Sequence, residues 1–304
     1  MEPALQLARD IGINRNNSNL FRMKLEYQVY KSYNPEATIE IDLTAFIIKI
    51  LNRLGVTLES IFGKNQSIPE EFYKRVISEW SQNEGMAVID HSIVDHKKIE
   101  KEFPILIEQQ DLLNPATRFI LSHLKEQETK VETPSKTTVL YIDRERAENI
   151  LFFEIVKVLV EILGREEGIR VYKKAVDHLA DKHAKLEPDS IEMDQFRKNF
   201  TGGLSDSGGF SFAIANMDDH MLLGKFDRCV VHESLKDVSD PELGYLVTCY
   251  TGMTMGNQRN LNIQMRRTQT LFNGNFCDEL YWDPRIHENP EQPSLEVSRN
   301  LRLE

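Results

Sequence analysis

The chain has 304 residues, 40% hydrophobic and 28% charged, a globular balance that allows one large domain or two ordinary ones. Its 37 Lys and Arg against 48 Asp and Glu give a formal net charge of −11, which argues against nucleic acid as a partner. We expect no secretory signal, because residues 1–14 contain no basic segment followed by an apolar stretch. We expect no membrane partner, because the longest apolar-rich stretch, residues 150–163, carries charges and is short. Three cysteines argue against a disulfide framework and predict a cytoplasmic protein.

The first part of the chain, residues 1–127, is predicted to form a mostly helical domain. Apolar residues recur near helical spacing in four stretches, and Gly55 is a C-cap signal at the end of one of them. His91 and His96 are five positions apart and are interpreted as solvent-facing loop residues rather than metal ligands. The predicted helices cover residues 21–30, 42–54, 69–80 and 114–124.

A polar and charged segment, residues 128–138, follows this helical domain. It contains Pro134 and has the composition of a linker. We therefore predict a second domain over residues 139–304. It begins with a short apolar run that predicts a strand, and two helices over residues 147–163 and 166–185 come next.

The apolar pattern changes to a period of two from Phe210 onward, as in half-buried strands. The glycine-rich stretch before it, residues 202–209, is interpreted as a surface loop. Asn273-Gly274 is the strongest hairpin signal in the chain. We expect strands at residues 210–217, 221–231, 261–272 and 276–282.

A helix is predicted between the second and third of these strands. Residues 239–242 combine a capping side chain, an early proline and an acidic first turn. The apolar face of this helix includes Cys249, and the polar tail after Pro284 is expected to run over the surface. The predicted fold class is α+β: an antiparallel sheet with packed helices in the C-terminal domain, preceded by a mostly helical N-terminal domain.

All three cysteines fall in the C-terminal domain, on a strand (Cys229), a helix (Cys249) and a strand (Cys277). Alternation predicts that Cys229 faces the same way as Asp227. Three interpretations remain open. The thiols are buried core residues, or they form a metal site together with His232, or one of them is a reactive thiolate with His232 as its base.

Arginines are the cations nearest to these cysteines in the sequence. Arg228 adjoins Cys229 and is expected to point to the opposite face of its strand. Arg266 and Arg267 alternate on a predicted strand, so one of them should face inward and need a partner. Arg267 is the candidate to hold a substrate carboxylate, since its planar guanidinium suits that group.

Three stretches hold the cysteines: Gly224–Cys229 (GKFDRC), Asp240–Cys249 (DPELGYLVTC) and Arg267–Cys277 (RTQTLFNGNFC). In order and approximate spacing they resemble the L-2-amino-thiazoline-4-carboxylic acid hydrolase family. That family has an arginine–cysteine pair on a strand, a cysteine on the next helix, and a threonine–leucine strand that closes with a glycine turn and a third cysteine. The resemblance covers roughly the last hundred residues well and the two helices after the linker loosely, and it does not extend to residues 1–127.

The resemblance implies ring-opening hydrolysis of a small cyclic amidine or thiazoline that carries a carboxylate. On this basis our hypothesis is that Cys229 is the nucleophile or a polarising thiolate, that His232 or a nearby acid transfers the proton, and that Cys249 and Cys277 complete the pocket. Arg267 and Arg228 are then the candidate substrate-binding residues. No cofactor is expected, a metal at the cysteines is disfavoured, and a homodimer stays open.

The chain departs from the family pattern at two positions. The pattern has an acidic residue three positions after the helix cysteine, where this chain has Gly252, and an aromatic residue two positions after the last cysteine, where it has Glu279. Two other functions therefore stay open. One is a non-catalytic module that binds a small ligand and docks a partner through its N-terminal helices, and the other is a tailoring enzyme in a biosynthetic pathway.

Overall fold

The chain divides into two compact units in the computed structural model. Unit 1 consists of Met1–Ala37, His183–Glu233 and Gly252–Glu304, and unit 2 of Thr38–Lys182 and Ser234–Thr251. The structure describes residues 5–6, 10–15, 19–24, 27–63, 68–81, 110–124, 136–186 and 191–301.

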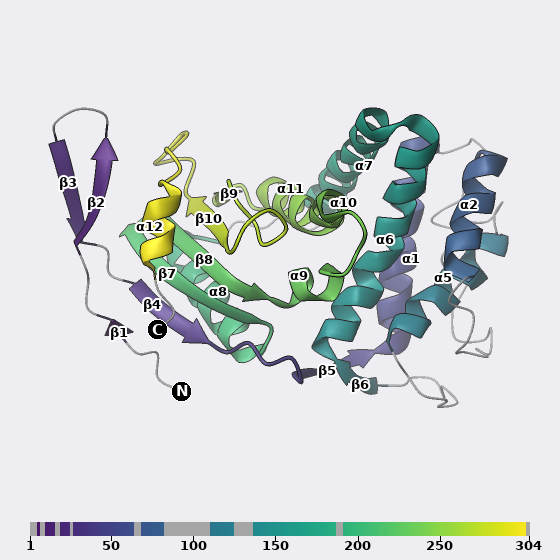
Figure 1. Ribbon diagram of the computed structural model, residues 1–304, viewed down its shortest axis with the longest axis horizontal. Helices are drawn as coiled ribbons and strands as arrows, with labels where there is room; N and C mark the ends of the chain where they lie inside the picture. The colour runs from purple at the N-terminus through teal and green to yellow at the C-terminus, as the bar shows by residue number, and fades with distance from the viewer. Residues whose placement is uncertain are drawn as a thin grey trace. The chain divides into compact units, whose positions relative to one another are not determined.

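Unit 1 is built on a six-stranded antiparallel sheet with the order β1-β4-β7-β8-β10-β9 (Figure 1). The hairpin of β7 and β8 forms its centre, and β4, from far earlier in the chain, pairs with β7. A separate hairpin joins β2 (Asp10–Arg15) and β3 (Asn19–Lys24). The strands of the sheet are β1 (Leu5–Gln6), β4 (Tyr27–Lys31), β7 (Phe210–Asp218), β8 (Met221–Cys229), β9 (Gln264–Arg266) and β10 (Cys277–Trp282).

Each face of this sheet has its own hydrophobic core, because the side chains of a strand alternate between faces. Helix α8 (Met193–Asp206) covers one face, where its Phe196 and Phe200 pack against a buried cluster that includes Phe212, Phe226 and Tyr281. Helix α12 (Leu295–Asn300) lies on the opposite face (Figure 1). The α8 face is the one that carries the candidate site.

The segment from α12 to Leu301 is part of the core of unit 1. Val297 and Leu301 are 1% and 0% exposed and pack against the α12 face of the sheet. The buried Lys225 of β8 anchors this segment, since its Nζ donates to the carbonyl of Leu301 at 3.0 Å and lies 2.9 Å from the Asp227 carboxylate. The prediction that the tail after Pro284 runs over the surface is therefore wrong for this segment.

Unit 2 is helical apart from the antiparallel pair of β5 (Thr38–Asp42) and β6 (Lys136–Leu140). Its central helix α6 is buried along most of its length and contacts α2, α5 and α10. Asp42 caps α1 by accepting a hydrogen bond from the backbone N–H of Ala45 at 2.9 Å. The helices of unit 2 are α1 (Leu43–Phe62), α2 (Glu70–Ser81), α5 (Gln110–His123), α6 (Tyr141–Leu163), α7 (Arg165–Leu186), α10 (Pro241–Tyr245) and the π-helical turn η2 (Leu246–Tyr250).

Several predicted elements are confirmed, and the α+β fold class with an antiparallel sheet is confirmed with them. Gly164 ends α6 with a φ of 82°, a conformation that favours glycine. Asp240 caps α10 through bonds from the backbone N–H groups of Glu242 and Leu243. The confirmed elements are the helices predicted at residues 69–80, 147–163 and 166–185 and the strands at 210–217 and 221–231.

Other local predictions are wrong. The helix expected at residues 21–30 is replaced by β3 and β4, because Tyr27 and Val29 alternate toward the α12 face in strand geometry. Gly55 lies inside α1, which continues to Gly63, where φ is 92°. Gly202 and Gly203 belong to α8 rather than to a loop, and a side chain at either position would meet no neighbouring atom within 4 Å.

The hairpin predicted at Asn273-Gly274 is also wrong as a tight turn. β9 and β10 do pair, but the paired strands end at Arg266 and begin again at Cys277. The Asn273 side chain accepts a hydrogen bond from the backbone N–H of Thr270 at 2.7 Å, so it organises a longer loop.

The two units do not follow one another along the chain, since segments from both sides of the predicted linker occur in unit 1. Most of that linker, residues 128–135, lies outside the described residues, as do His91 and His96, and residues 136–138 belong to β6. The division at residues 1–127, 128–138 and 139–304 stays a prediction. Among the described helices, none has the length and apolar character needed to cross a membrane.

Candidate functional site

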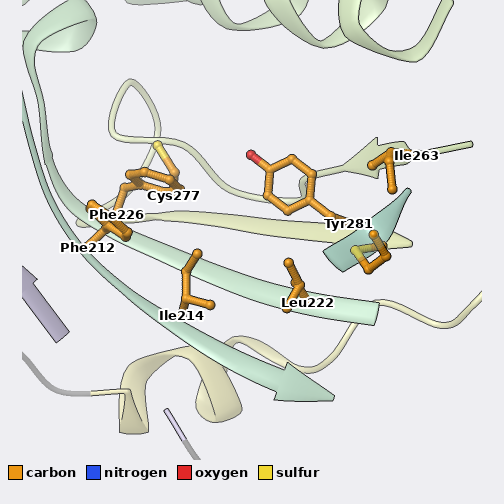
Figure 2. Close-up of a cluster of buried hydrophobic side chains, with 8 residues drawn as sticks. Phe212, Ile214, Leu222, Phe226, Ile263, Cys277 and Tyr281 are labelled. Carbon is orange, nitrogen blue, oxygen red and sulfur yellow. The ribbon is translucent and has the colours of Figure 1, made fainter. Parts of the chain in front are cut away.

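Cys277 is the first residue of β10 and lies in the buried cluster on the α8 face. It pairs with Phe226 of β8 and is only 5% exposed. Figure 2 shows Cys277 and Tyr281 rising from the same side of β10. The backbone N–H of Leu271 donates to the Cys277 Sγ atom at 3.3 Å.

A buried ion pair lies two residues further along the same face. Arg267 Nη2 is 2.8 Å from Glu279 Oε1, and each side chain is 10% exposed. The Tyr281 hydroxyl donates to the other oxygen, Glu279 Oε2. Burial, helped by the negative charge of Glu279, raises the pKa of Tyr281 well above its ordinary value, so this hydroxyl stays protonated and keeps donating. The inward arginine expected from alternation is thus Arg267, and Glu279 is its partner.

The loop between β9 and β10 is held by Asp278, which is 0% exposed. Its Oδ1 accepts from the backbone N–H groups of Thr268 and Gln269 at 2.9 and 2.5 Å, and its Oδ2 accepts from the Thr268 hydroxyl and from Gln292. This carboxylate therefore fixes the segment that carries Arg267. The sequence analysis missed Asp278; the available signal was the pair of adjacent acidic residues, Asp278 and Glu279, within a predicted strand.

The aromatic layer above the ion pair comes mainly from α8. The ring of Phe196 lies 5.1 Å from that of Tyr281, and Phe200 contacts Tyr281 edge-on at 5.0 Å. Gly224 is opposite Glu279 in the sheet, and a Cβ atom there would lie 3.3 Å from the Phe226 ring. Glycine at this position therefore leaves the aromatic side chains room to close over the strand.

Cys229 ends β8 and is half-buried. The pairing of β7 with β8 is irregular beside Asp227, and beyond that point Cys229 is opposite Phe210, whose ring packs against the α8-side cluster. Directly opposed residues share a face, so Cys229 faces the same side as Cys277 rather than that of Asp227. The expected alternation is wrong at this point because of the bulge.

His232 and Arg228 lie near this end of β8. His232 is in α9 (Val230–Leu235), its ring 4.9 Å from that of Phe272 and its Nδ1 3.9 Å from Glu233 Oε1. Arg228 is 60% exposed and pairs with the same Glu233 carboxylate at 3.2 Å. Its pairing opposite Ser211, one position before Cys229, agrees with the expected opposite orientation.

Cys249 belongs to unit 2, in the π-helical turn η2 between α10 and α11 (Thr251–Arg259). The Thr251 hydroxyl donates to the carbonyl of Leu246, and Arg53 Nη2 donates to that of Val247 at 3.1 Å, so both stabilise the turn. π-Helical turns are rare and frequent at functional sites. A side chain at Gly252, one turn later, would meet no atom within 4 Å.

The chemistry that these groups offer is that of thiols and proton transfer. All three cysteines are unbridged. Within the described part of the chain, no three His, Cys, Asp or Glu side chains converge in a way that would hold a metal ion. Cys249 belongs to unit 2 and the other two cysteines to unit 1, so the site of three thiolates and His232 considered from the sequence stays a hypothesis, and the absence of a cofactor stays a prediction.

Comparison with known proteins adds one match. No curated protein and no solved structure matches the chain. A family model does match, from Asp143 in α6 to Tyr281 in β10, and this segment contains all three cysteines and the Arg267–Glu279 pair. Over residues 143–281 the chain is thus similar to the L-2-amino-thiazoline-4-carboxylic acid hydrolase family, which confirms the resemblance seen in its sequence.

Proposed function

We propose that this protein is a hydrolase that opens a small amino-acid-derived heterocycle, a thiazoline or another cyclic amidine. The observation that carries the proposal is the buried Arg267–Glu279–Tyr281 network beside Cys277, on one sheet face within the segment similar to the hydrolase family. Buried charges need a partner and are costly to retain, so such a cluster is a candidate functional site.

Ring opening requires attack on the carbon that lies between the ring sulfur and the ring nitrogen. Water or a thiolate adds to this carbon, and the nitrogen takes a proton as the ring carbon–nitrogen bond breaks. Where a thiolate has added, water then attacks the same carbon and the thiolate leaves, so that either route adds one water in total. We assign the nucleophilic or polarising role to Cys229, which is half-buried and therefore more accessible than Cys277. His232, three residues further on and beside Glu233, is assigned the proton transfer.

Arg267 is assigned a different role from a clamp for the substrate carboxylate. Glu279 already neutralises its guanidinium at 2.8 Å. A second carboxylate at this point would meet a like charge in a buried environment, which is unfavourable. We therefore propose that Arg267 positions Glu279, and that the substrate presents a neutral or cationic amidine to this part of the site. The expected preference is 2-amino-thiazoline over 2-amino-thiazoline-4-carboxylate.

The test is to incubate the full-length protein with both compounds and to detect, by mass spectrometry, products heavier by one water. Cys229→Ala and His232→Gln are each expected to lower turnover by about 10²–10⁴-fold, the usual contribution of a group acting in acid–base catalysis. His220→Gln, at the exposed β7–β8 turn, is the matched control and should leave turnover unchanged. If Cys229→Ala folds and keeps full turnover, the nucleophile assignment is wrong.

A non-catalytic ligand-binding module is the second candidate, and one observation favours it. Both oxygens of Glu279 are already engaged, by Arg267 and by Tyr281, and Gly252 replaces the acidic residue of the family pattern. Native mass spectrometry separates the two functions. A small molecule that copurifies and persists without turnover supports the module, whereas a water-addition product supports the hydrolase.

A further inference from the structure

Unit 1 contains a cavity of about 190 Å³ that the proposed reaction does not use. It lies between α8 and the β4–β7 part of the sheet, on the α8 face. Gln28 of β4 and Ile214 and Asn216 of β7 form its floor and rim, and Lys198 and Thr201 of α8 lie on its other side. At roughly 30 Å³ per water molecule, the volume equals that of about six waters, which is the size of a small organic acid.

The charge of the cavity is positive, in a protein whose formal net charge is −11. Its two charged lining residues, Arg197 and Lys198, are both cations. Arg197 is partly neutralised by Asp194 at 2.7 Å, but that carboxylate is 79% exposed and does not line the cavity. Among the residues that the structure describes, none forms an ion pair with Lys198. An anion would therefore be attracted, and a positive group would find no partner in the lining.

The remaining lining residues combine hydrogen-bonding groups with an apolar wall. The side-chain amides of Gln28 and Asn216 offer N–H donors, whereas the Thr201 hydroxyl already donates to the carbonyl of Arg197 at 2.8 Å. Gln28 is held in place by a bond from the Tyr30 hydroxyl to its Oε1 at 2.6 Å. Ile214 is 5% exposed and gives the apolar surface. This mixture suits an anion that carries an aliphatic part better than it suits an inorganic one.

The cavity is separate from the Arg267–Glu279 cluster. Across the sheet, Gln28 pairs with Ile214, Ile214 with Gly224, and Gly224 with Glu279. Two strand spacings of about 4.8 Å put Ile214, the lining residue nearest in this row, roughly 10 Å from Glu279. A single small molecule does not span that distance, so occupation of one place leaves the other open.

We propose that this cavity is a second binding site, for a small aliphatic carboxylate that has no ammonium group. The carboxylate pairs with Lys198 and Arg197, the side-chain amides of Gln28 and Asn216 donate to its remaining oxygen lone pairs, and its aliphatic part covers Ile214. An α-amino acid is expected to bind more weakly than the matching acid without the amine, because the lining has no acidic side chain for the ammonium.

Isothermal titration calorimetry of the full-length protein tests the site with three probes: 3-methylbutanoate, L-valine and inorganic phosphate. The first two differ only by the ammonium group. We expect saturable binding of 3-methylbutanoate, about tenfold or more weaker binding of L-valine, and weaker binding of phosphate. Lys198→Glu should weaken 3-methylbutanoate binding by a similar factor. Asn216→Trp, at an exposed rim position, should fill the cavity and abolish the binding of 3-methylbutanoate.

Lys31→Glu, at an exposed position on β4, is the matched charge control and should leave binding unchanged. Thermal unfolding of each variant checks that its fold is retained. The proposal is overturned if no probe binds saturably up to millimolar concentrations, if Lys198→Glu and Lys31→Glu weaken binding equally, or if phosphate binds as tightly as 3-methylbutanoate. The last two results would mean a general attraction of anions rather than a site.

Discussion

The buried pair of Arg267 and Glu279 makes a quantitative prediction for stability. Both side chains are 10% exposed, so solvent screens their interaction little. Replacing Glu279 by Leu removes the carboxylate and leaves a guanidinium in a largely apolar layer, a change that typically costs about 3–5 kcal/mol. The Tyr281 hydroxyl loses its acceptor as well, at a cost of about 1–3 kcal/mol. The two effects share one carboxylate, so their sum is an upper bound for Glu279→Leu.

The double variant Arg267→Met/Glu279→Leu should be more stable than Glu279→Leu alone, because no unpaired charge is then buried. Adding Tyr281→Phe should recover more stability, since it removes the hydroxyl that lost its acceptor. As a control, Glu167→Ala breaks the exposed pair with Arg170, whose side chains are 45% and 52% exposed, and should leave the free energy of unfolding nearly unchanged.

The two tryptophans of the chain allow each unit to be followed by itself. Trp80 lies in α2 of unit 2, and Trp282 ends β10 of unit 1. In protein labelled with 5-fluorotryptophan, urea titration followed by fluorine NMR should move the Trp282 transition in the Glu279 variants and leave the Trp80 transition in place. The reasoning would be refuted if Glu279→Leu lowered the free energy of unfolding by less than about 1 kcal/mol, the range of an exposed pair. It would also be refuted if the double variant lost as much free energy of unfolding as Arg267→Met and Glu279→Leu lose together as single variants.

Three further predictions test other parts of the structure. Burial lowers the pKa of His123 in α5. The neutral imidazole therefore contributes to the stability of unit 2 above the unfolded pKa of about 6.5, and this contribution is lost as the pH falls through the lower folded pKa. His123→Phe should reduce the loss of stability at acidic pH that the Trp80 signal reports. Cys277, at 5% exposure, should be alkylated last of the three cysteines by iodoacetamide, and peptide mass spectrometry of the native protein gives the order. Gly252→Ala should stabilise α11 by about 0.5–1 kcal/mol in urea titrations, whereas Gly168→Ala should destabilise α7, where the new Cβ would lie 2.8 Å from the backbone of α6.

The elements that could be predicted from the sequence are those whose signals are local. A long apolar stripe ended by Gly164 gave α6, and a capping aspartate before a proline, Asp240, marked the start of α10. The strand β4 could not be found in this way. Its residues sit near helical spacing, and its partner β7 lies far along the chain, so the pairing is a tertiary effect that no local pattern contains.

Some features of the candidate site could also be predicted from local patterns, and others could not. Alternation alone indicated one inward arginine in need of a partner, and Arg267 with Glu279 fulfils that expectation. The facing of Cys229 was not predictable, because a single extra residue at the bulge turns it to the other side of the sheet. Nor was the role of Asp278, since its partners belong to a loop whose path only the folded chain defines.

Glu279 is the position at which the chain's chemistry departs most from the family pattern. An aromatic side chain in the α8-side layer would need no partner, whereas a buried carboxylate is tolerated only with compensating bonds. Here the compensation is complete, because Arg267 neutralises the charge and Tyr281 donates to the second oxygen. A neutralised arginine has little affinity left for a substrate carboxylate. If the proposed function holds, we expect the departure at Glu279 to affect the choice of substrate, and the comparison of 2-amino-thiazoline with its 4-carboxylate measures this effect directly.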